Sequence, residues 1–353
     1  MKVIYYLTKN GALFSNNSIV TFIPNSDLDS NPKKDNPLQD DSVDEIKLVD
    51  TKRTLPLENI ASIACFASVD LNTNVLNLLT KNNIPIILFD NYNPVGCFYP
   101  SFSQIDGDLT VLQSLFYISK DKRLEIARAF ISGSINNKIL NLSYYANRNM
   151  FEEFQIPKIE LLLTEIDNTR DINSLMLLEA QAQKLYFAHF NQIFKNKEFI
   201  FTKREFNPSP DPVNSLLSYS YALLYSTLIT EIATTKLNPF ISYLHSPGAN
   251  RTSLIWDISE IFKPLICDRL VFNLINHKII KPNMFSVNNN QCFINKTGKQ
   301  KIVQAYNEKL KTTIFNRENQ KQQSYRYIIR NEYYKIINYL KDNQEYKPFK
   351  IWW

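Results

Sequence analysis

Hydrophobic positions follow two different patterns along the chain, and the change comes near residue 105. In the first hundred residues, short β-branched and aromatic runs alternate with turn-forming Asn, Pro, Gly and Ser, a pattern typical of strands. The predicted strands cover residues 2–7, 18–23, 46–49, 60–66 and 84–89. A short helix is predicted over 72–81 from its apolar spacing. The polar, proline-rich residues 24–45 predict a mobile loop.

Beyond residue 105, apolar side chains recur every three or four positions, which predicts amphipathic helices. These cover residues 121–132, 135–145, 156–165, 174–194, 252–275, 301–316 and 326–341. Another helix begins at Asp211-Pro212, because Asp is a favoured N-cap and Pro fits the first helical position, and its segment closes at 237–239. Pro264 lacks an N–H, so we expect a kink where the carbonyl of Glu260 loses its helical partner.

These patterns predict an α+β protein of two domains. A small amino-terminal β-sheet domain would cover residues 1–104. A larger all-α carboxy-terminal domain would cover residues 105–353 and would end in a basic tail from about residue 296.

Composition excludes several classes of function. Only 6 of the 353 residues are glycine, and neither GxGxxG nor GxxxxGK[ST] occurs, which disfavours a phosphate-binding loop. Four scattered cysteines without a CxxC pair disfavour a zinc site or a disulfide framework and fit a reducing compartment. The amino terminus lacks an apolar signal core, and the uncharged stretch 212–230 is too polar for a membrane span. We expect a cytoplasmic protein without membrane contact.

The net charge of +6 is unevenly distributed along the chain. Residues 1–105 hold 8 Lys/Arg against 11 Asp/Glu, whereas residues 296–353 hold 13 against 5. Such a tail suits contact with a polyanion, although an ordinary lysine-rich, solvated surface would carry the same charge.

One histidine and three acids are the candidates for chemistry. His245 follows a predicted helix end, and Asp257 and Glu260 lie one helical turn apart, so their side chains share a face. Glu179 lies on a largely apolar helix, where an acid is costly unless it is paired. Imidazole and carboxylates together suit Mg²⁺ or Mn²⁺. Each residue also has an ordinary interpretation: solvent-facing acids, and a histidine that caps a helix or fills a core.

The sequence around these residues resembles the CRISPR adaptation integrase family, whose members insert new spacers into CRISPR arrays. The matching runs are Arg204, Asp211–Tyr219, Tyr221–Tyr225, Leu237-Asn238-Pro239, Leu244-His245, Ser253-Leu254, Asp257–Pro264 and Asp268-Arg269, with Glu179 before Tyr186-Phe187, Arg123 before Asn137–Asn141, and the closing Tyr346–Phe349. The chain departs from the family's pattern at four positions. Glycine is common at the positions of Ala180 and Ser242, proline at that of Ser209, and arginine at that of Lys263.

The resemblance implies a divalent-metal-dependent DNA endonuclease and integrase that joins 3′-hydroxyl ends of short DNA fragments to a repeat by transesterification. It implies Glu179, His245 and Glu260 as ligands of Mg²⁺ or Mn²⁺. Asp257 would hold a metal-bound water, orient His245, or take the third ligand position itself. Basic residues on or near these motifs are candidate contacts to DNA phosphates: Arg251, Lys263, Arg204 and Arg269.

The implied partners are DNA, as spacer precursor and as repeat array, and a second copy of the chain joined through the β domains. Two such homodimers would bridge a small partner subunit that sets the length of the captured DNA. Three other functions stay open from the residues alone. These are a transposase-type integrase with the same site, a DNA-binding scaffold without catalysis, and a metal-dependent hydrolase of a small substrate.

Overall fold

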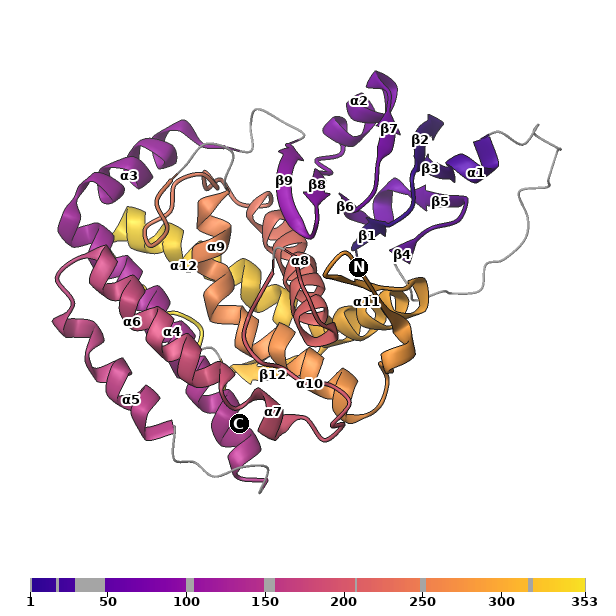
Figure 1. The fold of residues 1–353 in the computed structure, drawn as a ribbon. Coiled ribbons are helices and arrows are strands. Elements are labelled where there is room, and N and C mark those ends of the chain that lie inside the picture. The colour runs from indigo at the N-terminus through magenta and orange to yellow at the C-terminus, as the bar shows by residue number, and fades with distance from the viewer. Residues whose placement is uncertain are drawn as a thin grey trace. The chain divides into compact units, whose positions relative to one another are not determined.

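The computed structural model describes residues 2–16, 19–28, 48–99, 105–148, 156–206, 208–247, 252–316 and 320–352. These residues form two compact units, 1–105 and 106–353 (Figure 1). The first is built mainly of strands and the second mainly of helices, so the chain has the predicted α+β fold.

In the first unit, two small sheets are joined by short connections. Its elements are β1 (Val3–Leu7), β2 (Gly11–Asn16), β3 (Ile19–Pro24), α1 (Asn25–Leu28), β4 (Leu48–Val49), β5 (Arg53–Pro56), η1 (Leu57–Asn59), β6 (Ile60–Cys65), β7 (Val69–Leu71), α2 (Thr73–Lys81), β8 (Ile86–Asp90) and β9 (Asn93–Phe98). One sheet has the order β4-β1-β6-β8-β9 and is parallel except for the β8–β9 pair. The other has the order β5-β3-β2-β7.

The two sheets and α2 share one apolar core. Leu7 and Ile63 come from the first sheet, Phe22 from the second and Leu79 from α2, and all four are fully buried. Gly11 is required where β2 meets β3, because a Cβ there would lie 2.4 Å from the carbonyl oxygen of Ile23.

The strands predicted at 2–7, 18–23, 60–66 and 84–89 correspond to β1, β3, β6 and β8, and the helix predicted at 72–81 is α2. Four strands, β2, β5, β7 and β9, were not predicted. Within the predicted loop 24–45, residues 25–28 form α1, while residues 29–45 lie outside the described part of the chain. Of the predicted strand 46–49, only Leu48 and Val49 are described, and they form β4.

The second unit is mostly helical. Its elements are α3 (Gly107–Ile118), α4 (Lys120–Ala146), α5 (Ile156–Thr164), η4 (Ile166–Asn168), α6 (Ile172–Phe187), α7 (Phe190–Ile193), α8 (Pro212–Ile232), α9 (Ser253–Phe262), the π-helical segment η5 (Lys263–Asp268), α10 (Arg269–Asn276), η6 (Pro282–Met284), β10 (Phe285–Asn288), β11 (Gln291–Ile294), α11 (Lys296–Lys311), β12 (Thr313–Asn316), β13 (Lys321–Ser324) and α12 (Tyr325–Asp342).

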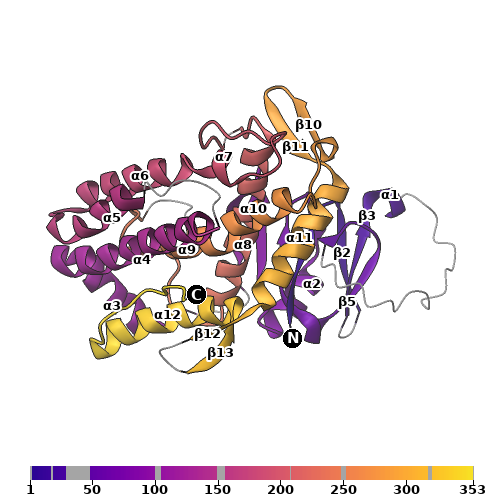
Figure 2. The ribbon, with the colours of Figure 1, turned by 90° about the horizontal axis from the view of Figure 1, so that it is seen from below.

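Helix α8 is the centre of this unit. All its residues from Val213 to Ile232 are buried, and it packs against α9, η5, α10, α11 and α12 (Figures 1 and 2). The predicted start is confirmed: Asp211 is the N-cap, its Oδ1 accepts a hydrogen bond of 2.9 Å from the N–H of Asn214, and Pro212 is the first helical residue. The whole circumference of α8 is therefore buried, because these elements surround the helix.

Two helix predictions need correction because the helices are shorter than expected. The helix predicted at 301–316 ends at Lys311, and residues 313–316 pair as β12 with β13. With the β10–β11 hairpin, this makes the second unit mostly, not wholly, helical. The helix predicted at 174–194 is interrupted after Phe187. Around Pro264, where a kink is predicted, α9 passes into the π-helical segment η5 before α10 begins.

The two helices predicted at 121–132 and 135–145 form one long helix, α4. Gly133 lies in its middle, where a Cβ would come within 2.7 Å of the Cβ of Pro348. Gly133 therefore provides space for the carboxy-terminal segment, which is the part of the chain that follows α12, instead of ending the helix. None of the helices in the described ranges combines the length and the apolar character needed to cross a membrane.

Candidate active site

Asp257 holds the segment that carries His245. The carboxylate is fully buried on α9, and its Oδ2 accepts hydrogen bonds from the backbone N–H groups of Tyr243 at 2.7 Å and Leu244 at 3.0 Å. Its Oδ1 accepts the backbone N–H of His245 at 3.0 Å and lies 2.8 Å from Nδ1 of the same residue. One carboxylate thus orients both the backbone and the ring of His245, and Nε2 is the ring nitrogen left for a ligand.

The surroundings of His245 act on its charge in opposite directions. Burial lowers the pKa of the imidazole, but the hydrogen bond to Asp257 and the negative charges of Asp257 and Glu260 outweigh burial, so the pKa is raised. Helix α4 supports the same segment, because Nε of Arg123 donates a hydrogen bond of 2.8 Å to the carbonyl oxygen of Tyr243.

Two lysine–glutamate pairs carry the other charges of the candidate site. Nζ of Lys138, on α4, lies 3.2 Å from Oε1 of Glu179 on α6. Nζ of Lys263, the first residue of η5, lies 2.6 Å from Oε1 of Glu260, one turn earlier. The Lys138 side chain is only 2% exposed and that of Glu179 is 23% exposed. Both glutamates therefore have a cation as a direct partner.

The charges of these residues act on one another. Burial raises the pKa of Glu260, but the positive charges of Lys263, Lys138 and His245 more than compensate, and the net shift is downward. Glu260 is therefore ionised at neutral pH. Because Lys138 contacts Glu179 and also stabilises the charged form of Glu260, the two carboxylates share one electrostatic environment.

The donor types suit a hard divalent cation, since two carboxylates and an imidazole are typical ligands of Mg²⁺ and Mn²⁺. Within the described residues, no three side chains of His, Cys, Asp or Glu converge in a way that could hold a metal ion. Instead, ammonium groups occupy positions next to the carboxylates of Glu179 and Glu260. The residues fit the ion in charge and chemistry, and Lys138 and Lys263 supply the positive charge that the carboxylates require.

A buried polar network lies at the other end of η5. Asp268 accepts hydrogen bonds from the hydroxyl groups of Tyr186 at 3.0 Å and Tyr221 at 2.8 Å. Nδ2 of Asn141 donates to the Tyr186 hydroxyl at 2.7 Å and to the carbonyl of Pro264 at 3.1 Å. These bonds connect α4, α6, α8 and η5, the elements around Glu179, Glu260 and Lys263. Tyr186 and Tyr221 are therefore core residues.

The four candidate DNA contacts have different surroundings. Arg204 bonds to Oδ1 of Asn214 at 3.0 Å and to Oγ of Ser218 at 2.9 Å, so its guanidinium is tied to α8. Lys263 is paired with Glu260. The guanidinium of Arg269 lies over the ring of Tyr144, with Cζ 4.0 Å from the ring centroid. Arg251 lies outside the described residues.

Comparison with known proteins identifies the family. The model of the CRISPR associated protein Cas1 family matches residues 39–308. A CRISPR-associated endonuclease Cas1 of Thermodesulfovibrio yellowstonii is 36% identical over 86% of the chain and 92% of its own length. That of Fusobacterium nucleatum is 35% identical over 100% of the chain and 98% of its own length.

The chain belongs to the Cas1 family. Cas1 proteins are CRISPR-associated endonucleases and integrases of spacer acquisition, and the family typically uses a divalent metal ion. Among solved structures, a Cas1 protein from Thermotoga maritima superposes with a TM-score of 0.79 at 27% identity, over 96% of the chain and 97% of its own length.

Two more distant structures share the Cas1 fold. A casposase bound to its integration product has a TM-score of 0.79 at 19% identity. The chain of a Cas6-RT-Cas1–Cas2 complex has a TM-score of 0.80 at 17% identity, over 36% of that longer chain. Proteins with this fold are thus known in a Cas1–Cas2 complex and bound to an integration product. The curated relatives at 35–36% identity are named CRISPR-associated, which favours the adaptation function over the transposase-type alternative.

Lys138 is a site residue that the sequence did not single out. It lies on α4, and a signal was present: Asn137, Lys138 and Asn141 form a polar group within an otherwise apolar helical stretch. All three are buried. Asn137 donates hydrogen bonds of 3.0 Å to the carbonyl oxygens of both Ile261 and Phe349, which joins α4 to α9 and to the carboxy-terminal segment. Buried polar side chains on an apolar helix face indicate partners from elsewhere in the chain.

Proposed function

We propose that Glu179, His245 and Glu260 hold a Mg²⁺ or Mn²⁺ ion in this Cas1-family protein and that Asp257 orients His245. The observation that supports this assignment is the set of four contacts that Asp257 makes to residues 243–245. Both oxygens of Asp257 are occupied by these donors, whereas the direct partner of Glu260 among the described residues is Lys263. Glu260 is therefore better suited than Asp257 to be the third ligand.

Each residue has a role that its surroundings support. The Asp257 carboxylate holds a proton on Nδ1 of His245, which keeps the lone pair on Nε2 available. The positive charges of Lys263 and Lys138 favour the ionised form of Glu260, and Lys138 pairs with Glu179. When bound, the divalent ion would polarise the scissile phosphate and stabilise charge on the attacking or leaving oxygen. Arg204, Arg251, Lys263 and Arg269 are the proposed contacts to DNA phosphates.

The proposed reaction is a transesterification. A 3′-hydroxyl oxygen of a spacer precursor attacks a phosphodiester of the repeat, one P–O bond forms, another breaks, and the leaving 3′-oxygen takes up the proton. No nucleotide triphosphate is consumed because one ester replaces another. Cas1 relatives solved with DNA or with Cas2 support DNA and a small partner subunit as ligands of this chain.

We further propose a homodimer joined through the β-strand unit, with residues 1–104 also contacting the small partner subunit. A cytoplasmic location fits the DNA substrate and the free thiols of Cys65, Cys97, Cys267 and Cys292.

The test is a cleavage assay on branched DNA with Mn²⁺. His245→Ala and Glu260→Gln should each lose more activity than the roughly 10–100-fold typical of an outer-shell partner. Glu160→Gln, a change of the exposed glutamate on α5, is the matched control and should cut like the wild type. If His245→Ala cuts as fast as the wild type, the metal-site mechanism is wrong, and a scaffold that only binds DNA becomes the better description.

A further inference from the structure

A basic cleft lies on the helical unit and contains none of the proposed metal ligands, although Arg269 on its wall is already a proposed DNA contact. It has a volume of about 570 Å³ and lies between the carboxy-terminal end of α4, α10 and the last turns of α11. Among the described residues that line it, Arg148, Lys195, Arg269 and Lys309 are basic, and Glu308 is the one carboxylate. Pockets of roughly 300–1,000 Å³ take small molecules, so this cleft has room for one or two nucleotides and not for a duplex.

Tyr144 positions two of these cations. Cζ of Arg148 lies 3.6 Å from the centroid of the Tyr144 ring, and Cζ of Arg269 lies 4.0 Å from it. Stacking on one ring restricts both guanidinium planes, so less freedom is lost when their N–H groups bind an anion. Arg148 is exposed, and a guanidinium plane is also a surface on which an unpaired base can stack.

Lys309 adds a partly desolvated ammonium to the same wall. Burial, and with it the positive charge of Arg269, lowers the pKa of Lys309 to about 8. Nζ of Lys309 lies 4.4 Å from the ring centroid of Tyr325. Cations that repel one another in a partly dry cleft gain from a bound anion, because the anion offsets both the repulsion and the lost hydration.

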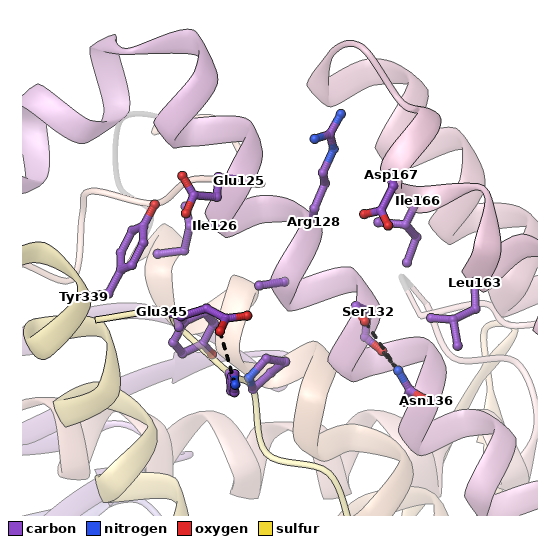
Figure 3. Close-up of a pocket in the computed structure, with 14 residues that line it drawn as sticks. Glu125, Ile126, Arg128, Ser132, Asn136, Leu163, Ile166, Asp167, Tyr339 and Glu345 are labelled. Atoms are coloured by element: carbon purple, nitrogen blue, oxygen red, sulfur yellow. Dashed lines mark hydrogen bonds and ion pairs between the residues drawn. The ribbon is translucent and has the colours of Figure 1, made fainter. Parts of the chain in front are cut away.

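A second cavity of the same unit has the opposite character. It measures about 430 Å³ and lies beside α4, η4 and the carboxy-terminal segment (Figure 3). Three carboxylates line it, those of Glu125, Asp167 and Glu345 (Figure 3). Arg128, also on its wall, already donates to the carbonyl oxygen of Thr169. Anions are therefore disfavoured there and favoured in the basic cleft.

The basic cleft shares two elements with the candidate active site. Helix α4 carries Lys138 and, six residues later, Tyr144, a separation of about 9 Å along the helix axis. The continuous α9–η5–α10 segment carries Glu260 and then Arg269. A single DNA strand that passes the candidate active site could therefore reach the cleft within a few nucleotides.

We propose that this basic cleft binds phosphate groups of an unpaired DNA strand next to the reacting segment. Arg148, Lys195, Arg269 and Lys309 contact the phosphates, and Arg148 supplies a stacking face for a base. The inference rests on the proposed function, because it takes the ligand to be the DNA on which the candidate active site acts.

The experiment measures binding of the full-length protein to a short fluorescein-labelled single-stranded DNA in EDTA, over a range of salt concentrations. Each phosphate contact to a single strand contributes about 0.7 to the slope of log affinity against log salt. The double variant Arg148→Gln/Lys195→Gln should lower this slope by about 1.4, because both side chains are exposed and the fold does not depend on them. Lys281→Gln/Lys311→Gln removes the same charge from exposed lysines that do not line the cleft, and its slope should equal that of the wild type.

Three outcomes would overturn the proposal. They are equal slope changes in both double variants, no change in either, or an effect that appears with duplex DNA and not with a single strand. Competition by inorganic phosphate at the same phosphate concentration as the DNA would instead identify a site for small free phosphates and would also contradict it. Because binding is measured without metal, a failure of the cleft is distinguishable from a failure of the catalytic assignment, which is scored by Mn²⁺-dependent cleavage.

Discussion

Asp257 and His245 are connected through both the backbone and the side chain, since Oδ1 of Asp257 lies 3.0 Å from the His245 amide nitrogen and 2.8 Å from its Nδ1. The two residues are 12 positions apart, on α9 and on the segment before it. A single buried oxygen therefore determines where the imidazole ring points. Its partner Oδ2 holds the two preceding amides, so one carboxylate accepts the backbone N–H groups of all three residues 243–245.

Asp257→Asn should weaken the site without removing a proposed ligand. The amide nitrogen of Asn is a donor, so one of the two positions that now accept hydrogen bonds would face an N–H group. We expect a loss of roughly 10–100-fold in Mn²⁺ affinity and a destabilisation of about 1–3 kcal/mol. Titration followed by electron paramagnetic resonance measures the affinity, and urea unfolding measures the stability. Asp108→Asn, on an exposed residue of α3, is the control, and an equal loss in both variants would contradict the orienting role.

Local chemistry explains which parts of the fold the sequence could predict. Asp211-Pro212 carries both the N-cap and the first helical residue, so the start of α8 follows from two adjacent positions. The strand β12 does not, because residues 313–316 become a strand only by pairing with residues 321–324. The apolar pattern of α11 runs into this hairpin without a break, so the helix predicted from it extends through residue 316.

The candidate site shows the same division between local and distant information. The spacing of Asp257 and Glu260 placed them on one helix face, but it could not show that their carboxylates have different partners. Asp257 turns toward the backbone of residues 243–245, and Glu260 pairs with Lys263. Lys138 was not singled out because its partner Glu179 is 41 residues away, on another helix.

Lys138→Met should make stability depend on divalent cations. Without this buried ammonium, Glu179 loses its direct partner and Glu260 loses part of its compensating charge. We expect a destabilisation of about 1–3 kcal/mol in EDTA, below the roughly 3–5 kcal/mol of a fully buried pair because Glu179 is 23% exposed. Thermal unfolding with and without Mn²⁺ measures the effect, and the ion should restore more stability to the variant than to the wild type.

The control for this prediction is Lys184→Met, which removes an exposed lysine from α6. It should unfold like the wild type in both conditions. If Mn²⁺ stabilises the wild type, Lys138→Met and Lys184→Met equally, the Lys138 ammonium does not lie where a divalent cation binds.

Gly133→Ala should loosen the carboxy-terminal segment. The added Cβ would lie 2.7 Å from the Cβ of Pro348 and 2.9 Å from its Cγ, so either α4 or the segment must shift. Overpacking of this kind costs about 1–3 kcal/mol. Gly107→Ala, at a position on α3 with open space around it, should be neutral or stabilising by up to about 1 kcal/mol. Urea unfolding compares the two variants. Similar changes in the free energy of unfolding would show that the contact with Pro348 does not limit stability.

Because of Asp268, the free energy of unfolding should decrease as the pH rises from about 4 to about 6. Burial raises the pKa of its carboxyl to about 6, although hydrogen bonds from Tyr221 and Tyr186 act in the other direction. In this window the folded protein keeps a proton that the unfolded chain has released, so the free energy of unfolding decreases as the pH rises. Relative to Asp268→Asn, which does not titrate, the wild type should lose about 2–3 kcal/mol from pH 4 to pH 7.

Tyr221→Phe provides a second variant that separates titration from simple loss of packing. It removes a donor that stabilises the charged form of Asp268, so the pKa should rise further and the loss of stability should extend to higher pH. Urea unfolding at a series of pH values measures all three proteins. Parallel curves for the wild type and Asp268→Asn would show that this carboxyl does not titrate in the folded state over this range. A shifted curve for Tyr221→Phe would show that the hydroxyl acts through Asp268, which joins η5 to the helices that carry the candidate site.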